Sequence, residues 1–487
     1  MSDLRSLPAR PDLRRLRDEA KARRRGGEFP TLALAQLAIA REHGFASWPR
    51  LKTQVEALTL EAGERAEALV RSACSSDVRR ARALLQVDPP LAGHDLACAC
   101  VSGEAAEVAR RLRREPGLAR TAVAPLGREP ILYACFSRLL RTEPERAAGI
   151  RAVVRLLLDA GADPNAAFDH EGWRQVPLYG AAGIANDAEL TRMLIDAGGD
   201  PNDAGSREVG EALYHATEFA DPTCAALLVD AGTDPEVVSH CLGRALNFSN
   251  HAMVEMLCRH GARARAAHLH QAVARRRPAR TVEVLLGAGA PIDEPAENGL
   301  TALRIATRWG NDELVQVLVR HGADPSLVTG GDRALGAWMS GAGAAGTGAT
   351  NLDGMLDLAA QSGDVEAARR LLDAGAAVDG AGETGRDAPL GQAAWRGHAA
   401  LVRELVRRGA RLQFPDGGSA LGAALHGSRH CSDPEGGPTM RPVQEIPRER
   451  YANVVGLLIE AGAPIPDWDG HPRPATIIAE LGLDPPA

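Results

Sequence analysis

The sequence predicts an all-α protein built from stacked helix-turn-helix repeats, and two observations carry this prediction. First, two apolar runs with helical spacing lie at residues 301–310 and 312–321, and Asn311, a favoured helix N-cap, stands between them. Second, a glycine suited to close a second helix recurs, mostly at intervals of 28 to 37 residues. It is found at Gly161, Gly198, Gly232, Gly261, Gly289, Gly322, Gly375, Gly409 and Gly462. A pair of short helices cannot bury its apolar face alone, so successive copies must pack on one another.

The copies also share short motifs. An L-L-x-x-G-A run is well kept, as within residues 156–165, and parts of a T-P-L-H-type box stand at 176–179, 388–391 and 419–422. In period and motifs, residues 62 to 480 resemble the ankyrin repeat. The resemblance implies an ankyrin-repeat solenoid of about eleven repeats. No copy holds the full T-P-L-H box, so we expect the side-chain hydrogen bonds of that box to be weakened.

Residues 1–60 do not follow the repeat pattern. Residues 40–52 resemble the A-R-E-x-G-F-x-S-W-P-x-L-K segment that precedes ankyrin repeats in many bacterial proteins. Ser47 is an N-cap type and Pro49 suits the first turn of a helix, so we expect a helical cap with Phe45 and Trp48 over the first repeat. The predicted organisation is a cap with a basic arm at 1–60 and a solenoid at 61–487. The solenoid carries insertions near 137–149, 326–354 and 427–450.

Charge and composition exclude several functions. The net charge is −7, which argues against nucleic acid as the main partner. Residues 1–60 hold 12 basic and 7 acidic residues, or +5, and the rest of the chain is −12. We interpret the basic arm as a solvated helix face, the alternative being contact with nucleic acid or an acidic partner. There is neither a signal peptide nor an apolar run long enough for a membrane span, so a cytoplasmic protein is expected.

Metal and cofactor binding find little support in the sequence. The eight cysteines show no C-x-x-C spacing, and we expect them to be reduced core thiols, with Cys135 in a buried slot. The long loop that starts at His426 offers His426, His430, Asp433 and Glu435, but the adjacent His430 and Cys431 cannot easily share one ion. His426 and His430 would share a helix face only if the helix continued past Gly427, which we do not expect. No metal, no cofactor and no catalytic residue is predicted.

A better signal appears when the repeats are aligned on their closing glycines. The two residues before the turn between the helices fall in a slot that contacts partners in the ankyrin family. Aromatic and arginine side chains, the types that dominate binding hot spots, gather there. The predicted partner-binding column is Phe219, Phe248, Arg276, Arg308, Trp309, Trp395 and Arg396. We expect these side chains to be exposed in the free protein, with Gln361 at a far rim of little importance. The alternative is that the aromatics pack on neighbouring repeats.

These observations favour a scaffold that binds a partner protein or peptide segment across its concave groove, without catalysis. The alternative is an enzyme or small-molecule-binding protein whose site lies between the 326–354 and 427–450 insertions. Fold alone does not choose between them, because function depends on the site that a fold carries. The sequence leaves open the partner, the pathway and the oligomeric state.

Overall fold

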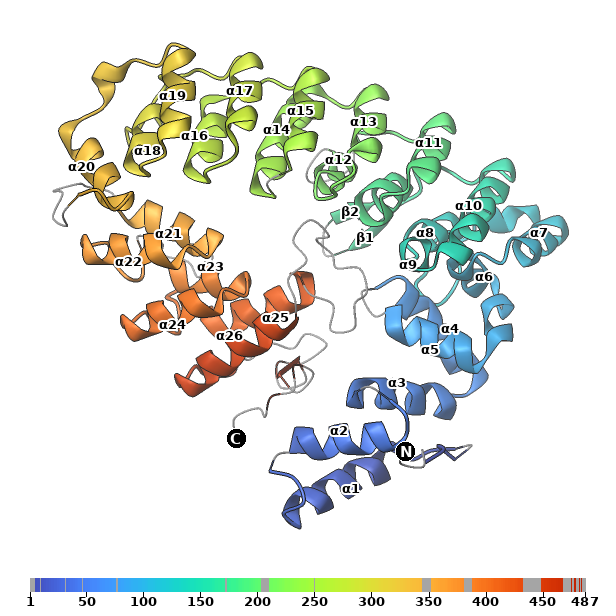
Figure 1. Cartoon of the computed structure of the whole chain (residues 1–487). Helices are drawn as coiled ribbons and strands as arrows, with labels where there is room; N and C mark the ends of the chain where they lie inside the picture. The colour runs from blue at the N-terminus through green and yellow to red at the C-terminus, as the bar shows by residue number, and fades with distance from the viewer. Residues whose placement is uncertain are drawn as a thin grey trace. The chain divides into compact units, whose positions relative to one another are not determined.

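A computed structural model of the chain describes residues 5–8, 10–30, 32–45, 47–75, 78–170, 173–202, 210–248, 250–343, 352–380, 388–431, 448–466, 474, 477–478, 481 and 483. It is mostly helical, with 26 α-helices among these residues (Figure 1). The chain divides into two compact units, unit 1 (Met1–Asp234) and unit 2 (Pro235–Ala487). Among the described helices, none combines the length and apolarity needed to cross a membrane.

Unit 1 begins with three helices that pack on one another: α1 (Leu13–Arg25), α2 (Leu32–Glu42) and α3 (Trp48–Thr59). The predicted cap signals at the start of α3 are confirmed, since the Ser47 side chain accepts a hydrogen bond from the Arg50 N–H and Pro49 lies in the first turn. Phe45 and Trp48, expected over the first repeat, pack against the apolar core of these three helices, and α3 meets the next helix pair through α5.

The rest of unit 1 is a series of packed helix pairs. The elements are α4 (Ala62–Ala73), α5 (Val78–Val87), η1 (Pro89–Gly93), α6 (Leu96–Ser102), α7 (Ala105–Arg114), η2 (Pro116–Arg120), α8 (Pro130–Cys135), α9 (Leu139–Thr142), α10 (Pro144–Asp159), η3 (Tyr179–Ala185), α11 (Ala188–Asp196), α12 (Glu211–Ala216) and α13 (Thr223–Asp230). The predicted insertion at 137–149 folds as α9 and the start of α10. The strands β1 (Phe168–His170) and β2 (Trp173–Gln175) form an antiparallel hairpin in which Asp169 faces Arg174.

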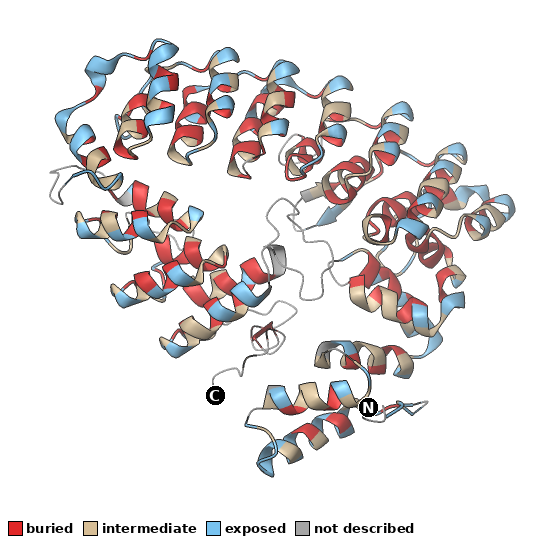
Figure 2. Ribbon diagram, in the orientation of Figure 1, coloured by how far each residue is buried: buried red, intermediate tan, exposed pale blue. Residues whose placement is uncertain are grey.

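Unit 2 continues with helix pairs of the same kind. They are α14 (Pro235–Asn247) with α15 (His251–Arg259), α16 (Ala266–Ala274) with α17 (Ala279–Gly287), α18 (Ala302–Arg308) with α19 (Asp312–Arg320), α21 (Asp353–Ser362) with α22 (Val365–Asp373), α23 (Pro389–Trp395) with α24 (Ala399–Arg407), and α25 (Ala420–Cys431) with α26 (Arg448–Glu460). First helices pack on first helices, as α14, α16 and α18 do. Buried residues lie where neighbouring helices face one another (Figure 2).

The local signals read from the sequence are confirmed. All nine closing glycines have a left-handed backbone, with φ between +83° and +103°, which a side chain would disfavour. Asn311 caps α19 by accepting a hydrogen bond from the Leu314 N–H. Cys135 is fully buried, as its place in the repeat predicted.

The 326–354 insertion contains a helix that the sequence analysis did not anticipate. After η4 (Pro325–Leu327), α20 (Gly330–Met339) packs against α18 and α22. A Cβ at Gly336 would lie 2.0 Å from the Thr307 carbonyl oxygen, so α18 and α20 touch backbone to backbone. Leu335 of α20 shares a core cluster with Trp309 and with Met355 of α21. Unlike the first helices of the repeats, α20 is not followed by a second helix of its own in the described residues.

Candidate functional site

The first helices of unit 2 end around one pocket of about 250 Å³. Five helix ends contribute to it, namely those of α14, α16, α18, α21 and α23. The described lining is Asn247, Ala274, Arg275, Arg276, Arg277, Trp309, Leu358, Gln361, Ser362 and Arg396. It contains four arginines and, among the described residues, no carboxylate. We call this the arginine pocket.

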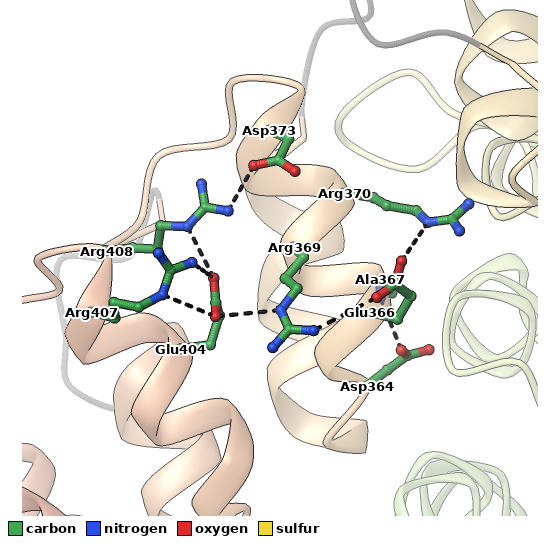
Figure 3. Close-up of polar contacts among 9 residues, drawn as sticks. All are labelled: Asp364, Glu366, Ala367, Arg369, Arg370, Asp373, Glu404, Arg407 and Arg408. Atoms are coloured by element: carbon green, nitrogen blue, oxygen red, sulfur yellow. Dashed lines mark hydrogen bonds and ion pairs between the residues drawn. The ribbon is translucent and has the colours of Figure 1, made fainter.

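An ion pair links two parts of the arginine pocket that are far apart in the sequence. Arg276 Nη2 lies 2.7 Å from Asp364 Oδ2, although the two residues are 88 positions apart. Asp364 also caps α22, because its Oδ1 accepts a hydrogen bond from the Ala367 N–H at 2.9 Å (Figure 3). The carboxylate that starts α22 therefore anchors the turn that follows α16.

Arg276 occupies an unusual backbone position. Its φ is +50°, in the left-handed region, where the turns after α18 and α23 carry the glycines Gly310 and Gly397. A non-glycine residue in this region is uncommon and costs about 1 kcal/mol or more. The Arg276 guanidinium lies 4.8 Å from the centre of the Trp309 ring, in a cation–π contact. Together with Asp364, this contact offsets the strain and holds the cation at the pocket.

The neighbouring arginines Arg277 and Arg275 differ in their hydrogen bonds. Arg277 donates from Nε to the Leu246 carbonyl (2.9 Å) and from Nη2 to the Asn247 carbonyl (3.1 Å), which ties α16 to the end of α14. Arg275 has neither an ion pair nor a side-chain hydrogen bond with any described residue. Burial, followed by the nearby charge of Arg396, lowers the pKa of Arg275 to about 10. Arg275 is thus a partly desolvated cation without a compensating anion in the described lining.

Residues that line the pocket also hold buried polar atoms without a hydrogen-bond partner in the described part of the chain. They include the indole N–H of Trp309 and the Oε1 atom of Gln361. Each such group typically costs about 1–3 kcal/mol unless a ligand or water satisfies it. The arginine pocket therefore offers hydrogen-bonding capacity that the described protein groups leave unused.

The buried charge of Glu404, elsewhere in unit 2, is fully paired and contrasts with that of Arg275. Glu404 is 4% exposed and lies between Arg369, Arg407 and Arg408 (Figure 3). The hydrogen bond from Arg407, with those from the other two arginines, lowers the pKa of Glu404 to about 2. This network links α22 to α24 and has no surplus of unpaired groups, so we interpret it as structural.

Several members of the predicted column are not exposed, which corrects the sequence analysis. Phe219, Phe248, Arg308 and Trp309 are 6%, 5%, 4% and 6% exposed. The Arg244 guanidinium lies over the Phe248 ring. In unit 1, the Arg141 guanidinium lies over the Phe219 ring. The physical reason is that other side chains of the protein cover these rings, as Arg141 does for Phe219 and the core cluster around Leu335 does for Trp309.

Arg308 is not only buried but also paired with a carboxylate outside the candidate site. Its Nε donates to Asp332 of α20 at 2.6 Å, and Arg304 Nε donates to the same carboxylate at 2.7 Å. Asp332 is fully buried, so this is a structural ion cluster between α18 and α20.

Three predicted residues do reach the arginine pocket, namely Arg276, Trp309 and Arg396. Trp395 is half-buried outside the described lining, with its ring 4.6 Å from that of His426. Gln361, expected at a far rim, lines the pocket itself. Sequence reasoning omitted Arg275 and Arg277, although the run Arg275-Arg276-Arg277 at one turn was a visible signal.

Most of the loop residues proposed for the enzymatic alternative have no described side chain. Asp433 and Glu435 lie outside the described residues, and so does the His430 side chain. The helix does continue past Gly427, contrary to expectation, because α25 extends to Cys431. His426 is exposed on this helix. No group of three or more potential metal ligands occurs among the described residues.

Unit 1 holds a separate buried titratable cluster. His215 Nε2 lies 3.3 Å from Glu211, and His215 Nδ1 lies 3.2 Å from Glu218. Burial alone would lower the pKa of His215, but the hydrogen bonds to both glutamates outweigh it and raise that pKa to about 9. Because both ring nitrogens are engaged inside the fold, the cluster stabilises α12 rather than forming an open site.

Comparison with known proteins agrees with the repeat pattern over part of unit 2. Residues 242–329 match the family model of ankyrin repeats, with three copies. This segment spans most of α14 to η4 and includes Asn247, Arg275–Arg277 and Trp309. Ankyrin repeats are generally protein-interaction modules. No curated protein matches the chain significantly.

Proposed function

We propose that this protein is an interaction module that binds a segment of a partner protein on the first-helix ends of unit 2, with the arginine pocket as the centre of contact. The single observation that carries the proposal is the convergence of five helix ends on a pocket lined by four arginines and Trp309. Arginine and tryptophan are enriched at the centres of protein interfaces.

The repeat architecture supports the same proposal. The helix pairs outside residues 242–329 carry the same closing glycines in the same left-handed conformation as those inside it. We therefore propose that ankyrin-type repeats extend from about residue 62 to the end of the helical region. Such an array presents successive helix ends side by side, which suits an extended partner segment.

The test is affinity capture with the full-length protein from cells that produce it, followed by a binding titration with each purified partner. The pocket variant is Arg275→Gln combined with Arg396→Gln, and the matched control is Arg259→Gln on α15, whose side chain is 67% exposed. We expect the pocket variant to weaken a specific partner at least tenfold, which is about 1.4 kcal/mol, and the control to match wild type. A partner set and affinities that do not change in the pocket variant would refute the proposal.

A further inference from the structure

We propose that the arginine pocket binds a phosphomonoester group. The inference rests on the proposed function and deepens it, because it names the chemical group that the partner presents. Three independent features of the pocket lead to this assignment: its charge, its unused hydrogen-bond donors and its size.

The charge of the pocket favours an anion with more than one negative charge. The described lining holds four guanidinium groups and no carboxylate, and Arg275 has no partner among the described residues. A partner's carboxylate would compensate one positive charge, as Asp364 already does for Arg276. A phosphomonoester carries a charge of about −1.5 to −2 at neutral pH. It therefore matches the cluster better than a carboxylate does.

The unused donors favour a group with several acceptor oxygens. The Arg275 guanidinium and the Trp309 indole N–H both lack an acceptor in the described part of the chain. A phosphomonoester has three terminal oxygens that accept charge-assisted hydrogen bonds, and guanidinium groups bind it in a bidentate manner. Gln361 contributes as well, since its amide can turn so that the NH₂ group faces an anion.

The size of the pocket favours a single phosphate group. Its volume of about 250 Å³ is below the range of about 300–1,000 Å³ typical of sites for drug-sized ligands. A phosphate group with a few waters, at about 30 Å³ per water, fits this space.

The backbone at Arg276 is consistent with a binding role. Glycine at this position would remove the left-handed strain, yet the chain places a cation there, against Trp309 and Asp364. Strained positions of this kind cluster at ligand-binding sites. Arg276→Gly should accordingly change stability little, because the lost ion pair and cation–π contact are balanced by the relieved strain, while phosphate binding weakens.

The experiment is isothermal titration calorimetry of the full-length protein with inorganic phosphate and with O-phosphoserine at constant ionic strength. Acetate is the comparison anion. We expect both phosphate compounds to bind wild type, and acetate to bind at least tenfold more weakly. Arg275→Gln should weaken phosphate binding roughly tenfold or more, as the loss of a charge-assisted hydrogen bond does. Arg259→Gln should bind like wild type.

A second variant separates binding from folding. Trp309→Phe keeps an aromatic ring for Arg276 but removes the buried N–H. We expect a severalfold loss in phosphate affinity with only a small change in melting temperature, because removal of the buried unpaired donor offsets part of the packing lost with the smaller ring. Phosphate affinity that is unaffected by both Arg275→Gln and Trp309→Phe overturns the inference, as does acetate binding as tight as phosphate.

A further arm identifies the source of the phosphate group. A phosphoserine peptide from a captured partner is compared with its unphosphorylated form and with free O-phosphoserine. Tighter binding of the phosphopeptide than of both comparators assigns the site to a phosphorylated protein segment. Equal affinity for phosphopeptide and free O-phosphoserine assigns it to a small phosphate ester.

The two proposals fail in different ways. If a partner binds and loses affinity in Arg275→Gln, while no phosphate compound binds, the phosphate inference falls and the interaction function stands. If phosphate binds in the pocket but no partner depends on the pocket, the phosphate inference stands and the proposed interaction function falls.

Discussion

Replacing Asp332 by asparagine should destabilise unit 2 strongly. The Asp332 carboxylate is fully buried and accepts hydrogen bonds from Arg304 Nε (2.7 Å), Arg308 Nε (2.6 Å) and both the N–H (2.9 Å) and the hydroxyl (2.8 Å) of Thr329. Asparagine has one acceptor oxygen and turns an NH₂ group toward these donors. It also leaves the Arg308 cation, 5% exposed, without its counter-ion.

We expect Asp332→Asn to lower the unfolding free energy by about 3–5 kcal/mol, which is the cost of removing one partner of a buried ion pair. The measurement is urea denaturation followed by far-ultraviolet circular dichroism. The control is Arg320→Gln, which removes an exposed pair with Glu283 and should cost at most about 0.5 kcal/mol. Adding Arg308→Met to Asp332→Asn should recover part of the loss, because it removes the uncompensated charge. A loss below about 1 kcal/mol in Asp332→Asn would refute the reasoning.

The pH dependence gives an independent check on the same residue. Burial alone would raise the pKa of Asp332, but the hydrogen bonds from Arg304, Arg308 and Thr329 outweigh burial and lower it well below its usual range. A lowered pKa in the folded state means that the stabilisation is present above about pH 4 and is lost as the pH falls through the folded-state pKa. The difference in unfolding free energy between wild type and Asp332→Asn should therefore shrink in acid.

Three other predictions address burial, pH and close packing. Trp309→Ala should cost about 3–5 kcal/mol of unfolding free energy, because the ring is 6% exposed, and a melting temperature equal to wild type would contradict this. The pKa of His215 is raised to about 9 in the fold, so the unfolding free energy of wild type should fall by up to about 3 kcal/mol as the pH rises from 6.5 through 9. Denaturation measured at each pH should show no such fall for His215→Gln. Gly336→Ala should disrupt the contact of α20 with α18, whereas Gly287→Ala, whose Cβ meets nothing within 4 Å, should be neutral or stabilising in thermal melts; equal effects would show that α20 is not tightly packed.

The sequence also located much of the candidate site, for a physical reason that can be stated. Aligning the repeats on their closing glycines placed Arg276, Trp309 and Arg396 in one column, and the structure gathers these three residues in the arginine pocket. Equivalent positions of stacked repeats lie near one another because each repeat packs on the next in the same way.

The exposure of that slot could not be read from the sequence. Trp309 was expected to face a partner, but it packs in a core cluster with Leu335 and Met355. Whether a side chain at a helix end meets solvent or a neighbour depends on the helix placed opposite it. That helix comes from residues outside the repeat itself, which no local pattern encodes.

What the sequence determined by itself is local: helix periodicity, the caps at Ser47 and Asn311, and the left-handed glycines, since each depends on a few adjacent residues. What only the tertiary structure decided is long-range. The insertion at 326–354 folds as α20, and unit 2 brings Arg276 to Asp364 across 88 residues. The pocket depends on this arrangement, because ion pairs and burial act between groups that are close in space whatever their separation along the chain.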